Sequence, residues 1–175
     1  MDVTDIAEGR AGTNGLRTTG SAHGGKVRSA QVVPRPEEMA SWRAFLRAHA
    51  TITRALETEL VAEQELSLAA YDVLVQLAEA PGRRLRMTEL AEAVLLSRSG
   101  VTRLVDRLER AGLVRRKRVE SDGRGVAAGL TPAGLDRLRT ASRTHLRGVT
   151  SHFARRLDAD DLAALERICS RLVVT

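Results

Sequence analysis

Residues 97–131 read SRSGVTRLVDRLERAGLVRRKRVESDGRGVAAGLT, and they carry the strongest signal for the fold of this chain. Ser97 is a suitable helix N-cap because its hydroxyl can accept a hydrogen bond from an N–H group of the first turn. The apolar residues behind it recur at helical spacing, which predicts a helix with one buried face. These residues are Val101, Leu104, Val105 and Leu108. Gly112 follows where a residue in the left-handed region would end the helix.

A basic hairpin is predicted after this helix. Leu113–Arg118 and Val126–Leu130 form two short strand patterns around a glycine-rich turn that carries Arg124. A polar, arginine-rich helix face beside such a hairpin indicates a winged helix-turn-helix. The helix can enter the major groove of duplex DNA, while the hairpin reaches the adjacent backbone or minor groove. The residues expected to contact double-stranded DNA are Ser97, Arg98, Ser99, Thr102, Arg103, Arg107, Lys117 and Arg124.

The net charge of the chain is +6, but this charge is unevenly distributed. Residues 83–124 carry 12 Lys and Arg against 6 Asp and Glu, whereas residues 36–82 carry 3 against 8. A generally high arginine content is the alternative explanation. However, the cations of the predicted helix lie on the face that its apolar stripe leaves free. The position of the basic segment therefore favours nucleic-acid binding.

Composition argues against several other classes of protein. Aromatic residues make up 2% of the chain, too few for a single-stranded nucleic-acid platform, which stacks bases on aromatic side chains. The single cysteine cannot form an intramolecular disulfide. No apolar run is long enough for a membrane span or a signal peptide, so we expect a cytoplasmic protein without a membrane partner.

The residue patterns of catalytic and metal sites are missing from the sequence. Its four histidines have no cysteine or carboxylate beside them at metal-ligand spacing. These histidines are His23, His49, His145 and His152. A nucleophile elbow and a phosphate-binding loop are also absent. We therefore expect no catalysis, no metal and no cofactor.

Residues 1–35 are rich in glycine and poor in apolar residues, so they are expected to form a disordered N-terminal arm that ends near Pro34 and Pro36. Two alternatives stay open. Basic residues of the arm could touch DNA phosphates, or a short ordered part could cover a partner subunit. The basic residues concerned are Arg17, Lys26 and Arg28.

We call the helix that begins after Ser97 the recognition helix. Two further helices are predicted ahead of it. Ser67 can cap the first of them, which Pro81-Gly82 ends. Thr88 can cap a short helix, Glu89–Val94, that would cross the DNA backbone. Together with the recognition helix and the hairpin, these segments give a winged helix-turn-helix over about residues 67–131.

Terminal helices are expected over about residues 37–64 and 132–173. Thr131 with Pro132 is a cap and first-turn pair that opens a long helix, and Asp158 can cap the last one. The apolar stripe of the long helix comprises Leu135, Leu138, Leu146, Val149, Phe153 and Leu157. The stripes of the first and last helices comprise Trp42, Phe45 and Ile52, and Leu162, Leu165, Ile168 and Leu172.

These stripes are too long for a small monomer to cover, so two copies are expected to interdigitate as a homodimer. The dimer would carry two copies of the winged helix-turn-helix, which we call the reading head. The expected fold is mainly α with a small β-hairpin wing. It is a winged helix-turn-helix joined to a helical dimerisation region that the N- and C-terminal helices form.

With this order of elements, the chain resembles the MarR family of bacterial transcriptional regulators. The resemblance covers residues 37–173, and the MarR-like domain is expected to be residues 36–175. Three motifs carry the resemblance. They are Leu90-Ala91, the run from Ser99 to Val114, and Asp122-x-Arg124…Leu130-Thr131-x-x-Gly134. One departure is Gly100, which lies inside the first turn of the recognition helix, where glycine costs up to about 1 kcal/mol relative to alanine.

The resemblance implies that Arg124 lies at the wing tip and enters the minor groove, and that Asp122 steadies it. It also implies an obligate dimer on a pseudo-palindromic operator and a small anionic or phenolic ligand that weakens DNA binding. Such a ligand would lie between the dimer helices and the reading head. The residues that could line this pocket are Trp42, Arg43, His49 and Tyr71. Each can also be explained by packing, by solvation or by a place in the dimer interface.

Two alternative functions remain. Cys169, on an apolar side of the last helix, could make the protein a thiol-based redox sensor, although a buried packing thiol is favoured. The winged helix could also serve as a protein-interaction module that no longer reads DNA. Arg103, Arg107 and Arg124 argue against that module.

Overall fold

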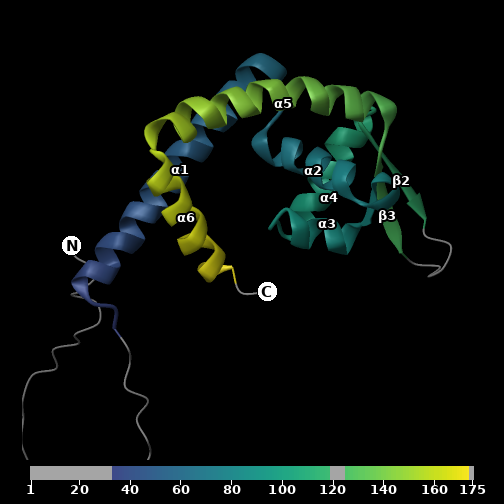
Figure 1. Cartoon of the computed structure of the whole chain (residues 1–175). Helices are drawn as coiled ribbons and strands as arrows, with labels where there is room; N and C mark the ends of the chain where they lie inside the picture. The colour runs from purple at the N-terminus through teal and green to yellow at the C-terminus, as the bar shows by residue number, and fades with distance from the viewer. Residues whose placement is uncertain (1–32, 119–124, 174–175) are drawn as a thin grey trace, which may run out of the picture. The chain divides into compact units, whose positions relative to one another are not determined.

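A computed structural model of the chain describes residues 33–118 and 125–173 (Figure 1). The expected N-terminal arm up to residue 32 lies outside these ranges, as do the expected wing residues Asp122 and Arg124. Residues 36–173 belong to one compact unit, Pro36–Thr175. The helices are α1 (Pro36–Gln64), α2 (Leu68–Glu79), α3 (Met87–Ala93), α4 (Arg98–Arg110), α5 (Pro132–His152) and α6 (Ala159–Leu172), with 3-10 turns η2 (Pro81–Arg83) and η4 (Ala154–Arg156). The strands are β1 (Arg84–Arg86), β2 (Val114–Arg118) and β3 (Val126–Leu130).

The fold is mainly helical with a small antiparallel sheet, which confirms the expected winged helix-turn-helix. Both hairpin strands form where the sequence predicts them, although β2 begins at Val114 rather than Leu113. The sheet has a third strand, β1, that sequence analysis missed. Its order is β1-β3-β2, with Arg84 paired with Gly129 and Arg86 with Ala127. The wing is therefore anchored along one edge of β3 by the segment between α2 and α3.

The core lies between the helices of the reading head and the sheet. The apolar stripe of α4 is buried as predicted, and it packs with side chains from α2, α3 and β2. The largest fully buried side chains are Leu60, Val73, Leu74, Leu77, Leu90, Val101, Val105 and Val114. Leu60 comes from α1, so the first helix takes part in the core of the reading head as well as in the terminal helical region.

α1 and α5 pack against each other through polar contacts near the end of α1 (Figure 1). The Thr144 hydroxyl, buried on α5, donates to Glu63 at 2.9 Å and accepts from the Gln64 amide at 3.1 Å. Glu63 also pairs with Arg147. The hydrogen bonds from Arg147 and Thr144 hold the pKa of the Glu63 carboxyl below its ordinary value. Hydrogen bonds and an ion pair, rather than apolar contacts, therefore join the two helices at this end of α1.

Two predicted helix boundaries are wrong. α3 begins at Met87 and its N-cap is Arg86, because the Glu89 carboxylate accepts from the Arg86 N–H at 2.8 Å; Thr88 is inside the helix. α5 ends at His152, and the backbone of Phe153 is no longer helical. The chain turns through η4 after this point, and Asp158 then caps α6, accepting from the Asp161 N–H at 2.8 Å.

The predicted apolar side of α5 is therefore wrong in part. Leu157 lies beyond the helix in an extended conformation, and Leu146 is 61% exposed. The residues of α5 that are buried are mostly small, and they are Gly134, Leu138, Ala141, Thr144 and Gly148. Small side chains on this face allow α5 to lie close to α1 and to the base of the wing.

A tight junction joins the end of the recognition helix to the start of α5. Gly112 has φ +73°, the left-handed conformation predicted for it. The Thr131 hydroxyl donates to the Gly112 carbonyl at 2.7 Å and accepts from the Gly134 N–H at 2.9 Å. A Cβ on Gly134 would lie 2.1 Å from the Leu113 carbonyl oxygen, so only glycine fits at this point of α5.

Gly134→Ala is expected to lower the free energy of unfolding by about 1–3 kcal/mol, because the added methyl group overpacks against a backbone carbonyl that cannot move aside. Urea denaturation followed by circular dichroism measures the change. Gly129→Ala is the matched control, since its Cβ would meet its nearest neighbour, Arg84 Cγ, at 3.4 Å. We expect the control to change stability by less than about 0.5 kcal/mol. Equal losses in the two variants would contradict this account of the junction.

Candidate nucleic-acid interface

The recognition helix α4 is capped as predicted. The Ser97 hydroxyl accepts from the Gly100 N–H at 3.1 Å and lies 3.2 Å from the Ser99 hydroxyl. The turn that precedes it contains Leu95 in the left-handed region, with φ +52°. These local contacts set the direction in which α4 leaves the turn, and they occupy the Ser97 hydroxyl with a structural hydrogen bond.

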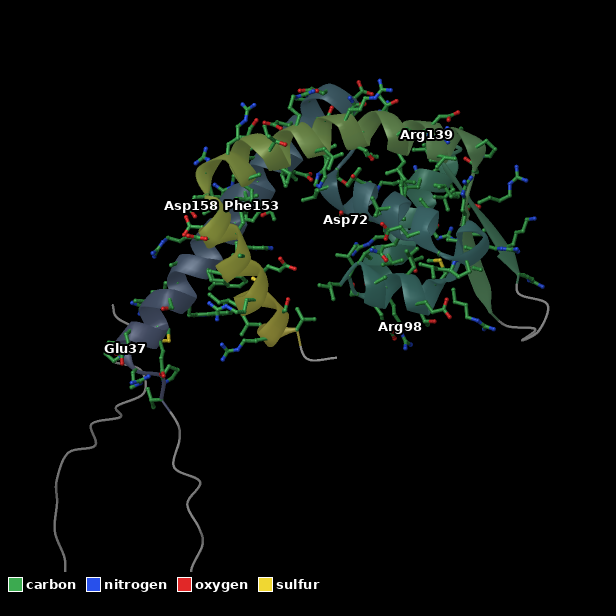
Figure 2. The ribbon with its side chains drawn as sticks, in the orientation of Figure 1. Glu37, Asp72, Arg98, Arg139, Phe153 and Asp158 are labelled. Carbon is green, nitrogen blue, oxygen red and sulfur yellow. The ribbon has the colours of Figure 1, made fainter. Side chains whose placement is uncertain are left out.

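The polar face of α4 is exposed along its length. The predicted DNA-contacting residues on and before the helix are all exposed, and they are Ser97, Arg98, Ser99, Thr102, Arg103 and Arg107. Within the described ranges, none of the three arginines in this set has an ion-pair partner. The Thr102 hydroxyl donates to the Arg98 carbonyl at 2.8 Å, which leaves its methyl group on the outside. Arg98 lies at the outer edge of the molecule in Figure 2.

Arg116 ties the wing to the recognition helix, and sequence analysis missed it. From β2 its guanidinium pairs with Asp106 and, at 3.2 Å, with Glu109, and it donates to the Thr102 carbonyl at 3.0 Å. The Glu109 carboxylate also accepts from the Arg116 N–H at 2.8 Å. The acidic pair Asp106 and Glu109, at i and i+3 on α4, was the available signal. Asp106 belongs to the contact between helix and wing.

The strands present their side chains to two different faces. Val114 is buried and Arg116 half-buried toward α4, whereas Arg115 and Lys117 alternate with them and are exposed. Lys117 is therefore on the sheet face that points away from α4, paired with Ala127. Lys117, which is expected to contact DNA from the hairpin, thus lies on a different surface from the exposed arginines of α4.

The predicted effector residues are not brought together within one chain. Trp42, Arg43 and His49 are exposed on α1, whereas Tyr71 is buried in the core of the reading head next to Leu60. Trp42 lies about 27 Å from Leu60 along the axis of α1, from the rise per residue. On α1, Trp42 stacks on Phe45 with ring centroids 6.0 Å apart, and Phe45 on His49 at 6.4 Å.

Tyr71 instead stacks on His145 of α5, with ring centroids 4.5 Å apart. The Tyr71 hydroxyl lies 3.3 Å from the Ser142 hydroxyl. His145 Nδ1 is buried and has no hydrogen-bond partner among the described residues. Burial lowers the pKa of the His145 imidazole and raises the pKa of the Asp72 carboxyl, and the charge of each group acts against the shift of the other. The spacing of the histidines gave no signal for this pair.

A separate apolar groove of about 650 Å³ runs between α1, α6 and the turn before α6. Phe45, His49 and Ile52 line it from α1, and Leu162, Leu165 and Cys169 from α6. No residue of α6 is buried, and Ile168 and Leu172 on this helix are 46% and 66% exposed. The Cys169 thiol is partly exposed in the single chain and lies against the apolar lining of this groove.

Comparison with known proteins identifies the class to which this fold and interface belong. The sequence profile of the MarR family matches residues 64–125. The HTH-type transcriptional regulator PecS of Dickeya dadantii (strain 3937) is 30% identical over 132 residues, covering 73% of this chain and 78% of that protein. These matches agree with the motifs found in the sequence.

Two solved structures from Streptomyces coelicolor are also similar to the chain. AbsC, a MarR family transcriptional regulator, is 35% identical with a TM-score of 0.73, covering 80% of this chain and 94% of AbsC. Sco3205, a MarR family regulator solved in complex with DNA, is 35% identical with a TM-score of 0.74, covering 80% of this chain and 91% of Sco3205. The chain belongs to the MarR family of transcriptional regulators.

The relatives named above are transcriptional regulators. Across the described parts of the chain, no helix has both the length and the apolar character needed to cross a lipid bilayer. In the same ranges, histidine, cysteine and acidic side chains do not gather in any group of three that could hold a metal ion.

Arg116→Ala is expected to lower the free energy of unfolding by about 1–2 kcal/mol, since it leaves Asp106 and Glu109 without their shared cation at a partly solvated site. Arg118→Ala removes the same charge from an exposed position of the same strand and is the matched control. Thermal and urea unfolding of both variants measure the difference. A loss of stability as large in the control would show that net charge, rather than the link between wing and helix, is responsible.

Proposed function

We propose that this protein is a sequence-specific, duplex-DNA-binding transcriptional regulator that acts as a homodimer on a pseudo-palindromic operator. The observation that carries the proposal is that α4 has one buried apolar face and one exposed basic face. Its apolar stripe is buried in the reading head, while Arg98, Arg103 and Arg107 stand exposed without ion-pair partners in the described part of the chain. A helix of this kind fits the major groove. Sco3205, which was solved with DNA, supports the same use of the fold.

The roles of the individual residues follow from their chemistry. An arginine can donate two hydrogen bonds to the O6 and N7 atoms of guanine, so the exposed arginines of α4 are the candidates for base recognition. Ser99 and Thr102 lie on the same exposed face and can contact phosphate or base edges. For the wing tip, outside the described residues, the family resemblance supports an Arg124 that enters the minor groove and an Asp122 that steadies it.

The proposed homodimer rests on the groove between α1 and α6. Apolar residues that one chain leaves open there would be covered by the same surface of a second copy, as a two-fold interface requires. The resulting dimer would present two copies of α4. Half-sites about one helical turn apart, near 10–10.5 bp centre to centre, would match such a pair.

A protein-interaction module on the same scaffold is the weaker alternative. It would not need unpaired arginines on the exposed side of α4, where they repel one another and are paired with no carboxylate of the described residues. The charge and exposure of this face therefore support DNA as the partner.

Arg103→Ala is expected to weaken binding to an operator by about 1–3 kcal/mol and to relax the preference at one base position, if this side chain is bidentate to guanine. Arg124→Ala should weaken binding at all sequences, because a minor-groove arginine senses shape and potential more than base identity. Fluorescence anisotropy on genomic fragments retained by the purified protein measures both effects. Arg139→Ala, an exposed cation of α5 paired with Asp136, is the matched control. Unchanged affinity in both test variants would mean that another surface binds DNA.

Ile168→Glu is expected to shift the protein from dimer to monomer, because it places a charge in the apolar surface of α6 that the second copy would cover. The side chain is 46% exposed in the single chain, so the fold should survive. Leu95→Glu, at a position that is 92% exposed in the turn before α4, is the matched control and should stay dimeric. Light scattering at micromolar concentration measures the mass. A monomeric parent protein that binds operator tightly would contradict the dimer.

We also propose that a small aromatic carboxylate or phenol releases the regulator from DNA, through its differential affinity for the two conformations. Trp42 stacks on Phe45 but does not line the groove that the second copy would cover, so its ring is a suitable stacking surface for such a ligand. Titration of aromatic carboxylates against an operator complex should leave the response of Cys169→Ser intact and reduce that of Trp42→Ala. If peroxide releases the parent but not Cys169→Ser, the protein is a thiol-based redox regulator instead.

A further inference from the structure

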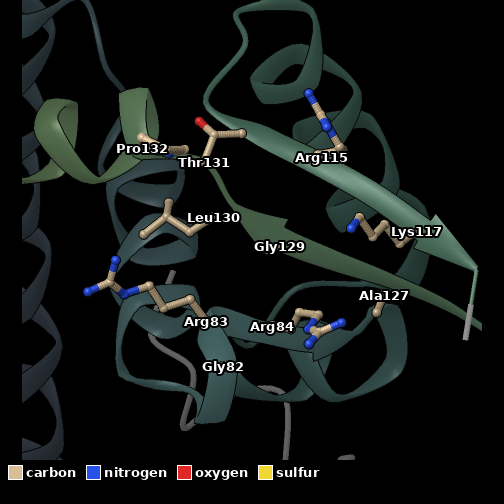
Figure 3. Close-up of a pocket in the computed structure, with 10 residues that line it drawn as sticks. All are labelled: Gly82, Arg83, Arg84, Arg115, Lys117, Ala127, Gly129, Leu130, Thr131 and Pro132. Atoms are coloured by element: carbon tan, nitrogen blue, oxygen red, sulfur yellow. The ribbon is translucent and has the colours of Figure 1, made fainter.

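The outer face of the wing sheet, which points away from α4, carries a cluster of cations. In the two-residue alternation of the strands, Arg115 and Lys117 of β2 lie on this face, as does Arg84 of β1. The central strand β3 contributes only Ala127 and Gly129 between them, as Figure 3 shows. Arg83 lies at the edge, just before β1. We call this surface the outer trough, defined by Arg83, Arg84, Arg115, Lys117, Ala127 and Gly129.

The shape of the outer trough follows from the sheet order. Arg84 and Arg115 both flank Gly129 in the register, one on each side. Neighbouring strands are about 4.8 Å apart, so the two rows of cations stand roughly 10 Å from each other across a floor of small side chains. The hollow has a volume of about 350 Å³, and Thr131 and Pro132 line it at the base of the wing. This volume is at the lower end of the range for small-molecule sites.

The charge of the outer trough is uncompensated. Among the described residues, none of Arg83, Arg84, Arg115 and Lys117 takes part in an ion pair. Asp106 and Glu109 hold Arg116 on the inner face of the sheet. Glu89 lines a neighbouring hollow with Arg84 and Lys117, but within the described ranges no ion pair joins it to either cation. Four cations thus surround one hollow, and an anion in the hollow would relieve their mutual repulsion.

The backbone beside the outer trough adopts a conformation that costs free energy. Gly82 and Arg83 both lie in the left-handed region, with φ +63° and +55°. A residue with a Cβ rarely adopts this conformation, and where it does so the surroundings often serve a binding site. This turn delivers Arg83 and Arg84 to the edge of the hollow.

We infer that the outer trough binds a small polyanion that carries phosphate groups. Arginine forms bidentate, charge-assisted hydrogen bonds with phosphate oxygens, and a floor of alanine and glycine lets such a group approach the sheet closely. The trough lies on the opposite face of the sheet from α4, and it extends to Thr131 and Pro132 at the base of the wing. The ligand is therefore a free polyphosphate rather than the DNA backbone, and the inference does not rest on the proposed DNA-binding function.

The test is calorimetric titration of the full chain with inorganic pyrophosphate in chloride buffer. We expect saturable binding of one pyrophosphate per chain, weakened about tenfold or more in Arg84→Ala/Arg115→Ala, since several charge-assisted hydrogen bonds are lost. Arg139→Ala/Arg155→Ala, two exposed cations at other places, loses the same net charge and should keep the parent affinity. Absence of saturable binding, or equal weakening in both double variants, would overturn the inference.

A second pair of measurements separates a free polyphosphate from the DNA backbone. Gly129→Val keeps every cation but fills the floor of the outer trough, so it should lose pyrophosphate binding while DNA binding stays at the parent level. Circular dichroism checks that this variant folds, and Arg84→Ala/Arg115→Ala supplies the same comparison if it does not. A loss of DNA affinity with a reduced salt dependence in the trough variants, but not in Arg139→Ala/Arg155→Ala, would assign the trough to DNA phosphates and overturn the proposal.

Discussion

The contact on which this structure depends most is the junction between the recognition helix, the wing and α5. One threonine hydroxyl, that of Thr131, binds the Gly112 carbonyl and caps α5 at the Gly134 N–H. Gly134 then lies against the Leu113 carbonyl at a distance that no side chain permits. The end of α4, the start of β2 and the start of α5 are thereby held at one place. This contact fixes the point at which α5 leaves the reading head.

Strand alternation divides the basic residues of the wing into two sets with different surroundings. On the inner face, Arg116 forms ion pairs with Asp106 and Glu109, and these ion pairs hold the wing against α4. On the outer face, Arg115 and Lys117 have only Ala127 and Gly129 between them and Arg84. Adjacent residues of one basic run therefore have different roles. Arg116 stabilises the fold, whereas Arg115 and Lys117 stay available to bind an anion.

The terminal helices leave apolar side chains, rather than charged ones, exposed on their surface. α6 has no buried residue, and its side chains face a groove that Phe45 and Ile52 of α1 also line. Cys169 lies in this same groove. A second copy that covered the groove, as we propose, would also cover the thiol, so dimerisation would limit the access of oxidants to Cys169. This limited access favours the packing role of Cys169 over a sensor role.

The elements that could be predicted from the sequence are those whose signals are local. The Ser97 cap, the stripe of α4, the left-handed Gly112 and the Thr131-Pro132 start of α5 each depend on residues within one or two turns, and all are found as predicted. The family and the exposed polar face of α4 could also be predicted from the sequence. The family follows from its motifs, and the exposed face is the one opposite the buried apolar stripe.

Contacts between segments far apart in the chain could not be predicted from the sequence and depend on the packing of the whole fold. β1 has three residues, too few to show a period, and it becomes a strand because β3 offers a free edge for hydrogen bonds. The partners of Arg116, the stacking of Tyr71 on His145 and the separation of Trp42 from Tyr71 likewise depend on where the helices meet. Periodicity shows which face of a helix is buried, but the neighbour that buries it is set by packing across the whole chain.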